Sequence, residues 1–462
     1  MEPTATIRST IEDYIRKQGY TLQYFADISG VNAGTLSAII KGTRPIAMAQ
    51  LDLLTEGMKL EEGHFYEQYG AECFVEAAPH WRRLEPFLQR CAELDKLDCI
   101  QNVIRQVTDD RSYISELFEM AEGMFERGQN QAALMLYECV AECEKYQHSE
   151  RLALCQYRIF TLSLGQDQHA NLRAAVHFEP FINRLDEERQ LDAIKDLANT
   201  YGGLNLWDKV LHLANELEER VNFMETIYRK NSDVSLNRLS KYPLFIYKYY
   251  SYLMKSVVFG EYQDYETALS FTKLYSDIHV ENASSEDRLF IERFKGWAEV
   301  NTYLFLLMMG NLEALKPYVN YIENNPDELL PGLVKILEAS NMYDINIDHV
   351  LTKFDSFISL LNGPDHLNSI YNTEISNERQ VKLLMELAKY YLRSSDSIEG
   401  FVQLLSCLSH AIRINDHKTI IYCVGLFEKN RSSAPNHIIN SYRQLIEEVY
   451  KGYEKKKNIY VH

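Results

Sequence analysis

Hydrophobic positions recur along most of this chain at the spacing of an amphipathic helix. From about Trp81 onward, apolar residues fall at i, i+3, i+4 and i+7, as they do between Leu191 and Tyr201. Few segments alternate between apolar and polar residues as a half-buried strand does. The pattern therefore predicts an all-α protein built mainly from long helices.

The N-terminal region shows the same periodicity in shorter segments, because glycines interrupt it repeatedly between Gly19 and Gly63. Thr21 and Asn32 precede two of these segments and suit the N-cap position of a helix. A proline in the stretch 76–80 should stop a helix, so we place a domain boundary near it. We divide the chain into residues 1–70, a repeat region over 71–440, and a C-terminal capping helix with a basic tail over 441–462.

Several windows of the long-helix region share one pattern. Each has a small residue, an aromatic residue three or four positions on, a turn at Gly or Asn, and a second small residue. The windows begin at Ala121, Ala198, Gln263, Gly310 and Leu387. Small residues let two helices of a hairpin approach closely, and aromatic rings fill the space beside them. The pattern resembles a degenerate tetratricopeptide repeat and predicts an α-solenoid, with a generic helical bundle as the alternative.

The net charge limits where this chain could contact nucleic acid. It carries 48 basic and 66 acidic residues, a formal charge of −18, and DNA repels such a chain unless a local patch reverses the sign. Residues 1–50 hold five basic and four acidic residues, a net charge of +1, which leaves −19 for the rest. Any DNA contact is therefore expected in the N-terminal segment.

Other classes of protein are disfavoured by missing signals. The longest apolar stretch, near 303–309, is too short to span a bilayer, and the N-terminus lacks the features of a signal peptide. The eight scattered cysteines suit free thiols in the cytoplasm. Phosphate-loop, dinucleotide, zinc-protease and nucleophile-elbow motifs are absent, and Cys139 and Cys143 suit buried thiols better than metal ligands. We therefore predict a cytoplasmic non-enzyme without cofactor or metal.

The segment from Thr21 to Pro45 meets the local requirements of a helix-turn-helix. Ala26 is small where the second helix must approach, and Gly30 lies where the turn needs a positive φ. Asn32 caps the second helix. The buried positions of that helix and its terminating glycine are Val31, Leu36, Ile39 and Gly42. The match resembles the Xre/Cro-like family over about residues 5–65.

This resemblance implies that the helix from Ala33 to Lys41 enters the major groove of a double-stranded DNA operator. Its groove-facing positions are Ala33, Gly34, Thr35, Ser37 and Ala38, of which Thr35 and Ser37 can hydrogen-bond to a base. Expected phosphate contacts are Gln23, Lys41, Thr43 and Arg44. Because such short side chains discriminate modestly between bases, we expect a homodimer that reads two half-sites. The alternative is a helix-turn-helix kept for packing or dimerisation.

A helix-turn-helix followed by tetratricopeptide-like repeats resembles the RRNPP family of peptide-pheromone receptors, which includes phage arbitrium receptors. The resemblance implies a quorum-sensing regulator in which a short linear peptide lies in the concave groove of the repeats and changes dimer geometry and DNA binding. Inward-facing positions in our repeat register are Asp192, Lys195, Asn199, Tyr250, Leu253, Trp297, Val300, Asn301, Lys382, Met385 and Lys389. Asn199 is the preferred backbone clamp, since an amide both donates and accepts.

The acidity of the repeats favours a neutral or basic peptide over an acidic one. Two other functions stay open from the sequence. The chain could be a protein-binding repeat scaffold or response-regulator antagonist that does not bind DNA. It could also be a regulator that senses no peptide.

Overall fold

The computed structural model describes residues 6–74, 80–107, 111–231, 241–280, 283–361, 373–394, 397–414 and 416–459. Within these ranges every regular element is an α-helix or a short 3₁₀ helix, and there is no strand. The all-α prediction is therefore confirmed. No helix of this described part combines the length and the apolar character needed to cross a membrane. Most of the stretch 76–80, where the sequence places a boundary, lies outside the described residues.

The chain forms two compact units. The first comprises Met1–Leu164 with Arg173–Ala193, and the second comprises Gly165–Leu172 with Ile194–His462. This division falls inside the region predicted to hold repeats. The domain boundaries predicted from the sequence at residues 70 and 440 stay predictions.

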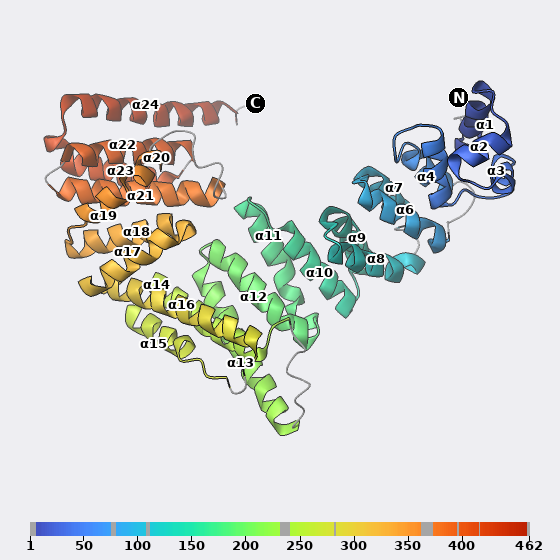
Figure 1. Ribbon diagram of the computed structural model, residues 1–462. Coiled ribbons are helices and arrows are strands. Elements are labelled where there is room, and N and C mark those ends of the chain that lie inside the picture. Colours follow the sequence, from blue (N-terminus) through green and yellow to red (C-terminus); the bar gives the residue numbers. More distant parts are fainter. Residues whose placement is uncertain are drawn as a thin grey trace. The chain divides into compact units, whose positions relative to one another are not determined.

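The first unit begins with four short helices and continues into helical hairpins (Figure 1). One hydrophobic core extends from Ile7 to Cys155 and joins the short helices to the hairpins. The helices are α1 (Ile7–Lys17), α2 (Leu22–Ser29), α3 (Ala33–Ile40), α4 (Met48–Gly57), α5 (Tyr66–Cys73), α6 (Trp81–Glu93), α7 (Leu97–Val107), η1 (Arg111–Tyr113), α8 (Ile114–Glu126), α9 (Asn130–Glu144), α10 (Glu150–Ser163) and η2 (Glu179–Arg184). Two further helices, α11 (Gln168–Phe178) and α12 (Glu187–Gly203), have residues in both units.

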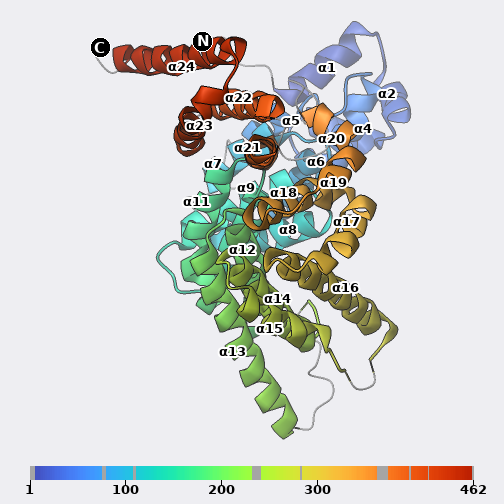
Figure 2. The ribbon, with the colours of Figure 1, turned by 90° about the vertical axis from the view of Figure 1, so that its left-hand side faces the viewer.

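The second unit is an α-solenoid, because its helices pack mainly against their neighbours in the chain. Figures 1 and 2 show this stacking, with α14 beside α15. Near the C-terminus, α22 packs against both α21 and α23. Its helices are α13 (Trp207–Asn231), α14 (Leu244–Glu261), α15 (Tyr265–Ser276), α16 (Ser285–Met308), η4 (Leu312–Ala314), α17 (Leu315–Asn324), α18 (Pro326–Tyr343), α19 (Asp348–Lys353), α20 (Asp355–Leu361), α21 (Thr373–Arg393), α22 (Ser397–Arg413), α23 (His417–Asn430), η6 (Arg431–Ser433) and α24 (Asn436–Ile459).

Five of the described helices from α8 onward end in the same type of turn, which also ends α1, α3, α4 and α6. A residue with positive φ follows each of α8, α12, α14, α16 and α18, and these residues are Gly128, Asn205, Gln263, Gly310 and Asp344. In every case the next backbone N–H donates to the carbonyl five residues earlier, as Gln129 does to Met124 at 2.9 Å. This is the bonding of a Schellman cap, which satisfies carbonyls at a helix end. The unequal spacing of the turns explains why the repeat is degenerate in sequence.

Small residues permit close helix packing at the positions that the repeat pattern predicts. Ala121, Ala133, Ala198, Ala214 and Ala268 are all fully or almost fully buried. The aromatic rings expected beside them, those of Tyr137 and Tyr201, have no exposed surface. The sequence windows therefore identified helical hairpins correctly.

Candidate functional site

The α2–turn–α3 segment has the caps that the sequence predicts. The hydroxyl of Thr21 accepts a hydrogen bond from the N–H of Tyr24 at 3.2 Å at the start of α2. Gly30 follows α2 with φ of 74°, and the side chain of Asn32 then accepts from Gly34 N–H at 2.9 Å. These bonds satisfy the free N–H groups of the first turns and fix where α3 begins.

One face of α3 is buried and the opposite face is open. Leu36 and Ile39 have no exposed surface, and Ala26 and Val31 beside them are nearly as buried. Gly34 is exposed, whereas Ala33, Thr35, Ser37 and Ala38 are partly exposed. Four of the predicted groove-facing residues are therefore accessible on α3, whereas Ala33 also packs against the hydrophobic core.

The side chain of Arg44, predicted to contact phosphate, lies beside the exposed face of α3. Its Nη1 atom lies 3.5 Å from the hydroxyl oxygen of Thr35. The backbone N–H groups of Thr43 and Arg44 both donate to the carbonyl of Ala38, at 3.0 and 3.3 Å, and so turn the chain back over α3. The Thr43 hydroxyl also donates to that carbonyl at 3.1 Å. Arg44 thus brings a long hydrogen-bond donor to a helix face that otherwise has only short side chains.

Two further basic residues lie near the end of α3. Lys41 is exposed at its C-cap. Arg8, on α1, approaches so closely that a Cβ atom at Gly42 would lie 3.1 Å from its Nη1 atom. Sequence reasoning missed Arg8, because only folding brings α1 to this end of α3. Gln23, the remaining predicted contact, is exposed and donates to Asp27 at 3.0 Å.

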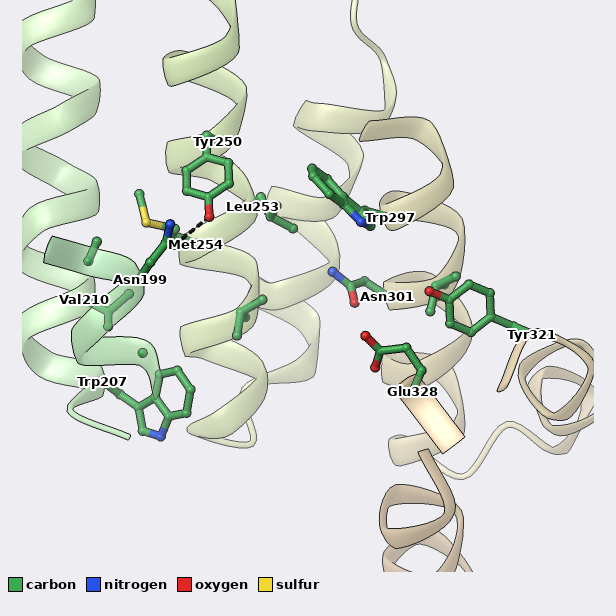
Figure 3. A pocket seen from close by; sticks show the side chains of 14 residues that line it. Asn199, Trp207, Val210, Tyr250, Leu253, Met254, Trp297, Asn301, Tyr321 and Glu328 are labelled. Atoms are coloured by element: carbon green, nitrogen blue, oxygen red, sulfur yellow. Dashed lines mark hydrogen bonds between the residues drawn. The ribbon is translucent and has the colours of Figure 1, made fainter. Parts of the chain in front are cut away.

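The second unit contains a pocket of about 370 Å³ on the inner helices of consecutive hairpins (Figure 3). Six residues that the repeat register places on inward-facing positions line it, namely Asn199, Tyr250, Leu253, Trp297, Val300 and Asn301. They come from α12, α14 and α16, which lie far apart in sequence. The structure therefore brings these six residues together around one pocket, and their binding role stays a prediction.

Sequence reasoning missed the other lining residues. They are Ala198, Gly202, Trp207, Val210, Met254, Val257, Tyr321 and Glu328. Trp207 and Val210 lie in the first turn of α13, and Tyr321 belongs to α17, so these three come from helices on which the register predicted no inward-facing position. Trp207 could have been predicted from the sequence, because it belongs to the repeat window that begins at Ala198.

Hydrogen bonds orient the two amide side chains in this pocket. The Tyr250 hydroxyl donates to Asn199 Oδ1 at 2.6 Å, and Asn301 Nδ2 donates to the Tyr275 hydroxyl at 2.8 Å. Burial raises the pKa of Tyr250 and of Tyr275, which keeps both hydroxyls protonated at neutral pH. Asn199 Nδ2 and Asn301 Oδ1 have no partner among the described residues, so the pocket offers a ligand one donor and one acceptor.

The remaining predicted peptide contacts lie outside this pocket. Lys195 pairs with Asp196, Lys382 with Glu338 at 2.8 Å, and Lys389 with Glu386 at 2.6 Å. Met385 is buried among the C-terminal helices. Asp192, partly exposed on α12, is also absent from the lining.

A smaller cavity of about 50 Å³ shares Val257 and Asn301 with the pocket and continues toward α18. Lys335 lines it, and its Nζ atom lies 3.3 Å from both Glu261 and Glu338. Because Glu338 also pairs with Lys382, these ion pairs connect α14, α18 and α21. These ion pairs therefore link three helices of the second unit beside the cavity.

No family model matches this chain, and no curated protein matches it. Among solved structures it is similar to a circular tandem repeat protein described as having a novel repeat topology and enhanced subunit contact surfaces. The two chains are 14% identical, with 96% of this chain and 99% of that one covered, and the TM-score is 0.20. A TM-score this low carries no argument about fold or function.

Proposed function

We propose that this chain is a DNA-binding transcriptional regulator whose repeat helices bind a short signalling peptide. In this proposal the peptide changes the geometry of a homodimer and thereby its affinity for a double-stranded DNA operator. The expected partners are the operator, the peptide and a second copy of the chain.

The DNA-binding part of the proposal rests chiefly on the exposed face of α3. A capped helix with an accessible N-terminal half suits insertion into the major groove. Thr35 and Arg44 place hydrogen-bond donors on that face, and Arg8 and Lys41 supply positive charge at the helix end. This arrangement is what a groove-reading helix needs, with base contacts at one end and phosphate contacts around it.

The peptide-binding part rests on the pocket around Asn199 and Asn301. An extended peptide exposes backbone donors and acceptors in alternation, and the two amides offer one of each. Aromatic side chains, including Trp207, Tyr250 and Trp297, supply apolar walls for its side chains. A concave surface of this kind is the usual binding face of a helical solenoid.

Mobility-shift assays with DNA from beside the chain's own gene test the DNA-binding part. We expect a shifted band at about 50 mM salt that weakens strongly by about 200 mM, because phosphate contacts release counterions. Light scattering on the same preparation should give the mass of a dimer. If no neighbouring fragment shifts at low salt, the regulator proposal fails, and a repeat scaffold or response-regulator antagonist becomes the better account.

Thermal unfolding tests the peptide-binding part. Synthetic C-terminal fragments of any short secreted peptide encoded immediately downstream should raise the unfolding temperature, whereas scrambled versions should not. A ligand at 100 times its Kd stabilises the folded state by about 2.7 kcal/mol. If the chain shifts DNA but no such peptide stabilises it, the peptide part fails while the DNA part stands.

A further inference from the structure

We infer that the pocket around Asn199 and Asn301 accepts an arginine side chain of the ligand, whose guanidinium group pairs with Glu328 beside the rings of Trp297 and Tyr321. This inference rests on the proposed function, since it takes the ligand to be a peptide. It names the residue type that the peptide presents to this pocket.

Glu328 is a carboxylate without a cation. It is exposed in the first turn of α18, and no ion pair or hydrogen bond of its side chain occurs among the described residues. Two other carboxylates, one on α17 and one further along α18, differ in this respect. Glu323 pairs with Lys353, and Glu338 pairs with Lys335 and Lys382. Among the described residues that line the pocket, Glu328 is the only one with a charged side chain.

The pocket places aromatic surface around this carboxylate. Figure 3 shows Glu328 directed toward Asn301, with Tyr321 on one side and Trp297 beyond the amide. Trp297 is 36% exposed, and its ring makes an edge contact with the ring of Phe294, with the two centroids 5.4 Å apart. A cation over an indole or phenol face is attracted by the ring quadrupole, and Trp is the strongest partner.

These features favour a guanidinium group over an ammonium group. Guanidinium is planar, stacks on aromatic rings and donates two parallel hydrogen bonds to one carboxylate, whereas ammonium is a compact and strongly hydrated charge. The chain beyond residue 50 carries a net charge of −19, which also attracts a cationic ligand and repels an acidic one. A neutral side chain of the same shape would lose the ion pair.

Glu328 also has a structural role that the experiment must separate from ligand binding. A carboxylate in the first turn of a helix interacts favourably with the helix dipole. Asp327 lies in the same turn of α18, is exposed, and is not among the pocket-lining residues. Asp327→Asn therefore removes the same charge from the same helix end and provides a matched control for Glu328→Gln.

Tryptophan fluorescence can report binding directly, because two of the three tryptophans, Trp207 and Trp297, line the pocket. The experiment uses the full chain carrying Trp81→Phe, which removes the third. The probes are acetyl-Ala-Arg-Ala-amide and the same tripeptide with citrulline, which is uncharged and nearly isosteric with arginine. Circular dichroism melts verify that each variant is folded.

We expect the arginine probe to bind the parent and Asp327→Asn about tenfold more tightly than the citrulline probe. Glu328→Gln should bind the two probes about equally. The inference is overturned if Glu328→Gln keeps the preference for arginine, if the parent shows none, or if neither probe binds at millimolar concentration. Should a downstream-encoded peptide stabilise Glu328→Gln as well as the parent, the arginine site fails while the peptide-receptor proposal survives.

Discussion

At the scale of single residues, Arg44 adds a long hydrogen-bond donor to the α3 face that we propose reads DNA. The helix itself offers two short hydroxyl side chains, Thr35 and Ser37, and neither makes the paired contacts that distinguish one base firmly from another. The guanidinium of Arg44 lies 3.5 Å from Thr35. If α3 occupies the major groove, Arg44 reaches the base edges, where arginine pairs with guanine through two hydrogen bonds.

Substituting Arg44→Lys should therefore reduce sequence discrimination while keeping the charge. We expect about 1–3 kcal/mol less discrimination at one base pair of each half-site, because lysine lacks the two-pronged geometry. Fluorescence anisotropy on the operator and on single-base variants measures this loss. A uniform weakening on all sequences would instead make Arg44 a phosphate contact.

Lys41→Ala provides the comparison, because Lys41 is expected to contact phosphate. It should weaken binding to every sequence alike and reduce the slope of log affinity against log salt by about one for each half-site. The same anisotropy titrations, repeated at several salt concentrations, give this slope. An unchanged slope would remove Lys41 from the proposed interface.

Local requirements could be inferred from the sequence, but contacts between distant residues could not. Thr21, Gly30 and Asn32 were predictable because capping and positive φ restrict the residue types allowed at one position. The approach of Arg8 to Gly42 depends on how α1 packs, and no local rule encodes it. The carboxylate of Glu328 was missed for the same reason.

At the scale of elements, glycines determine how closely some helices pack. A Cβ atom at Gly400 in α22 would lie 2.6 Å from the backbone nitrogen of Leu392 in α21. Backbone atoms cannot rotate away as a side-chain tip can, so the two helices would have to separate. Gly425 in α23 differs, because nothing lies within 4 Å of its added Cβ atom.

Gly400→Ala should consequently destabilise the second unit by about 1–3 kcal/mol, the usual effect of overpacking. Gly425→Ala should be stabilising by up to about 1 kcal/mol, because alanine is the better helix former. Urea denaturation followed by circular dichroism compares the two variants. The account of α21–α22 packing is wrong if Gly400→Ala is as stable as the parent.

A partly buried ion pair connects three helices of the first unit. Arg158 in α10 donates two hydrogen bonds of 2.9 Å to Glu122 in α8, and Tyr137 in α9 donates a third. Burial alone would raise the pKa of Glu122, but the bonds from Arg158 and Tyr137 hold it below its ordinary value. Glu122 therefore stabilises the folded state when it is ionised.

The pH dependence of stability follows from that direction. Because the pKa is lower in the folded state, the contribution of Glu122 is present at neutral pH and is lost as the pH falls below about 4. Glu122→Gln should be less stable at pH 7 and should lose less further stability on acidification than the parent. Denaturation at pH 7 and at about pH 3 measures both quantities, and parallel losses in the two proteins would contradict the assignment.

The helical hairpins were predictable from the sequence, and their spacing was not. Small and aromatic residues identified the turns at Gly128, Gln263 and Gly310, because close packing and a left-handed cap restrict composition. The turn at Asp344 lies outside the windows that the small and aromatic residues defined, so it was not predicted. Helices of unequal length shift the register, so Lys382, Met385 and Lys389 lie outside the pocket that their register predicted.

At the scale of the whole molecule, the distribution of charge separates the two proposed activities. Residues 1–50 carry +1 and the rest carry −19. DNA should therefore repel residues 51–462, and under the proposed function we expect attraction only near α3. In a homodimer, two such weak readers gain affinity by binding together, so a peptide that changes their separation would change DNA binding.

The most direct test of this account is the operator affinity of two double variants with equal loss of charge. Lys41→Ala with Arg44→Ala removes two cations beside α3, and Arg16→Ala with Lys17→Ala removes two exposed cations from the end of α1. We predict that the first pair weakens binding at least about tenfold, and that the second changes it by about twofold or less. Equal losses from the two pairs would show that net charge, and not the α3 face, accounts for DNA binding, and would contradict the account.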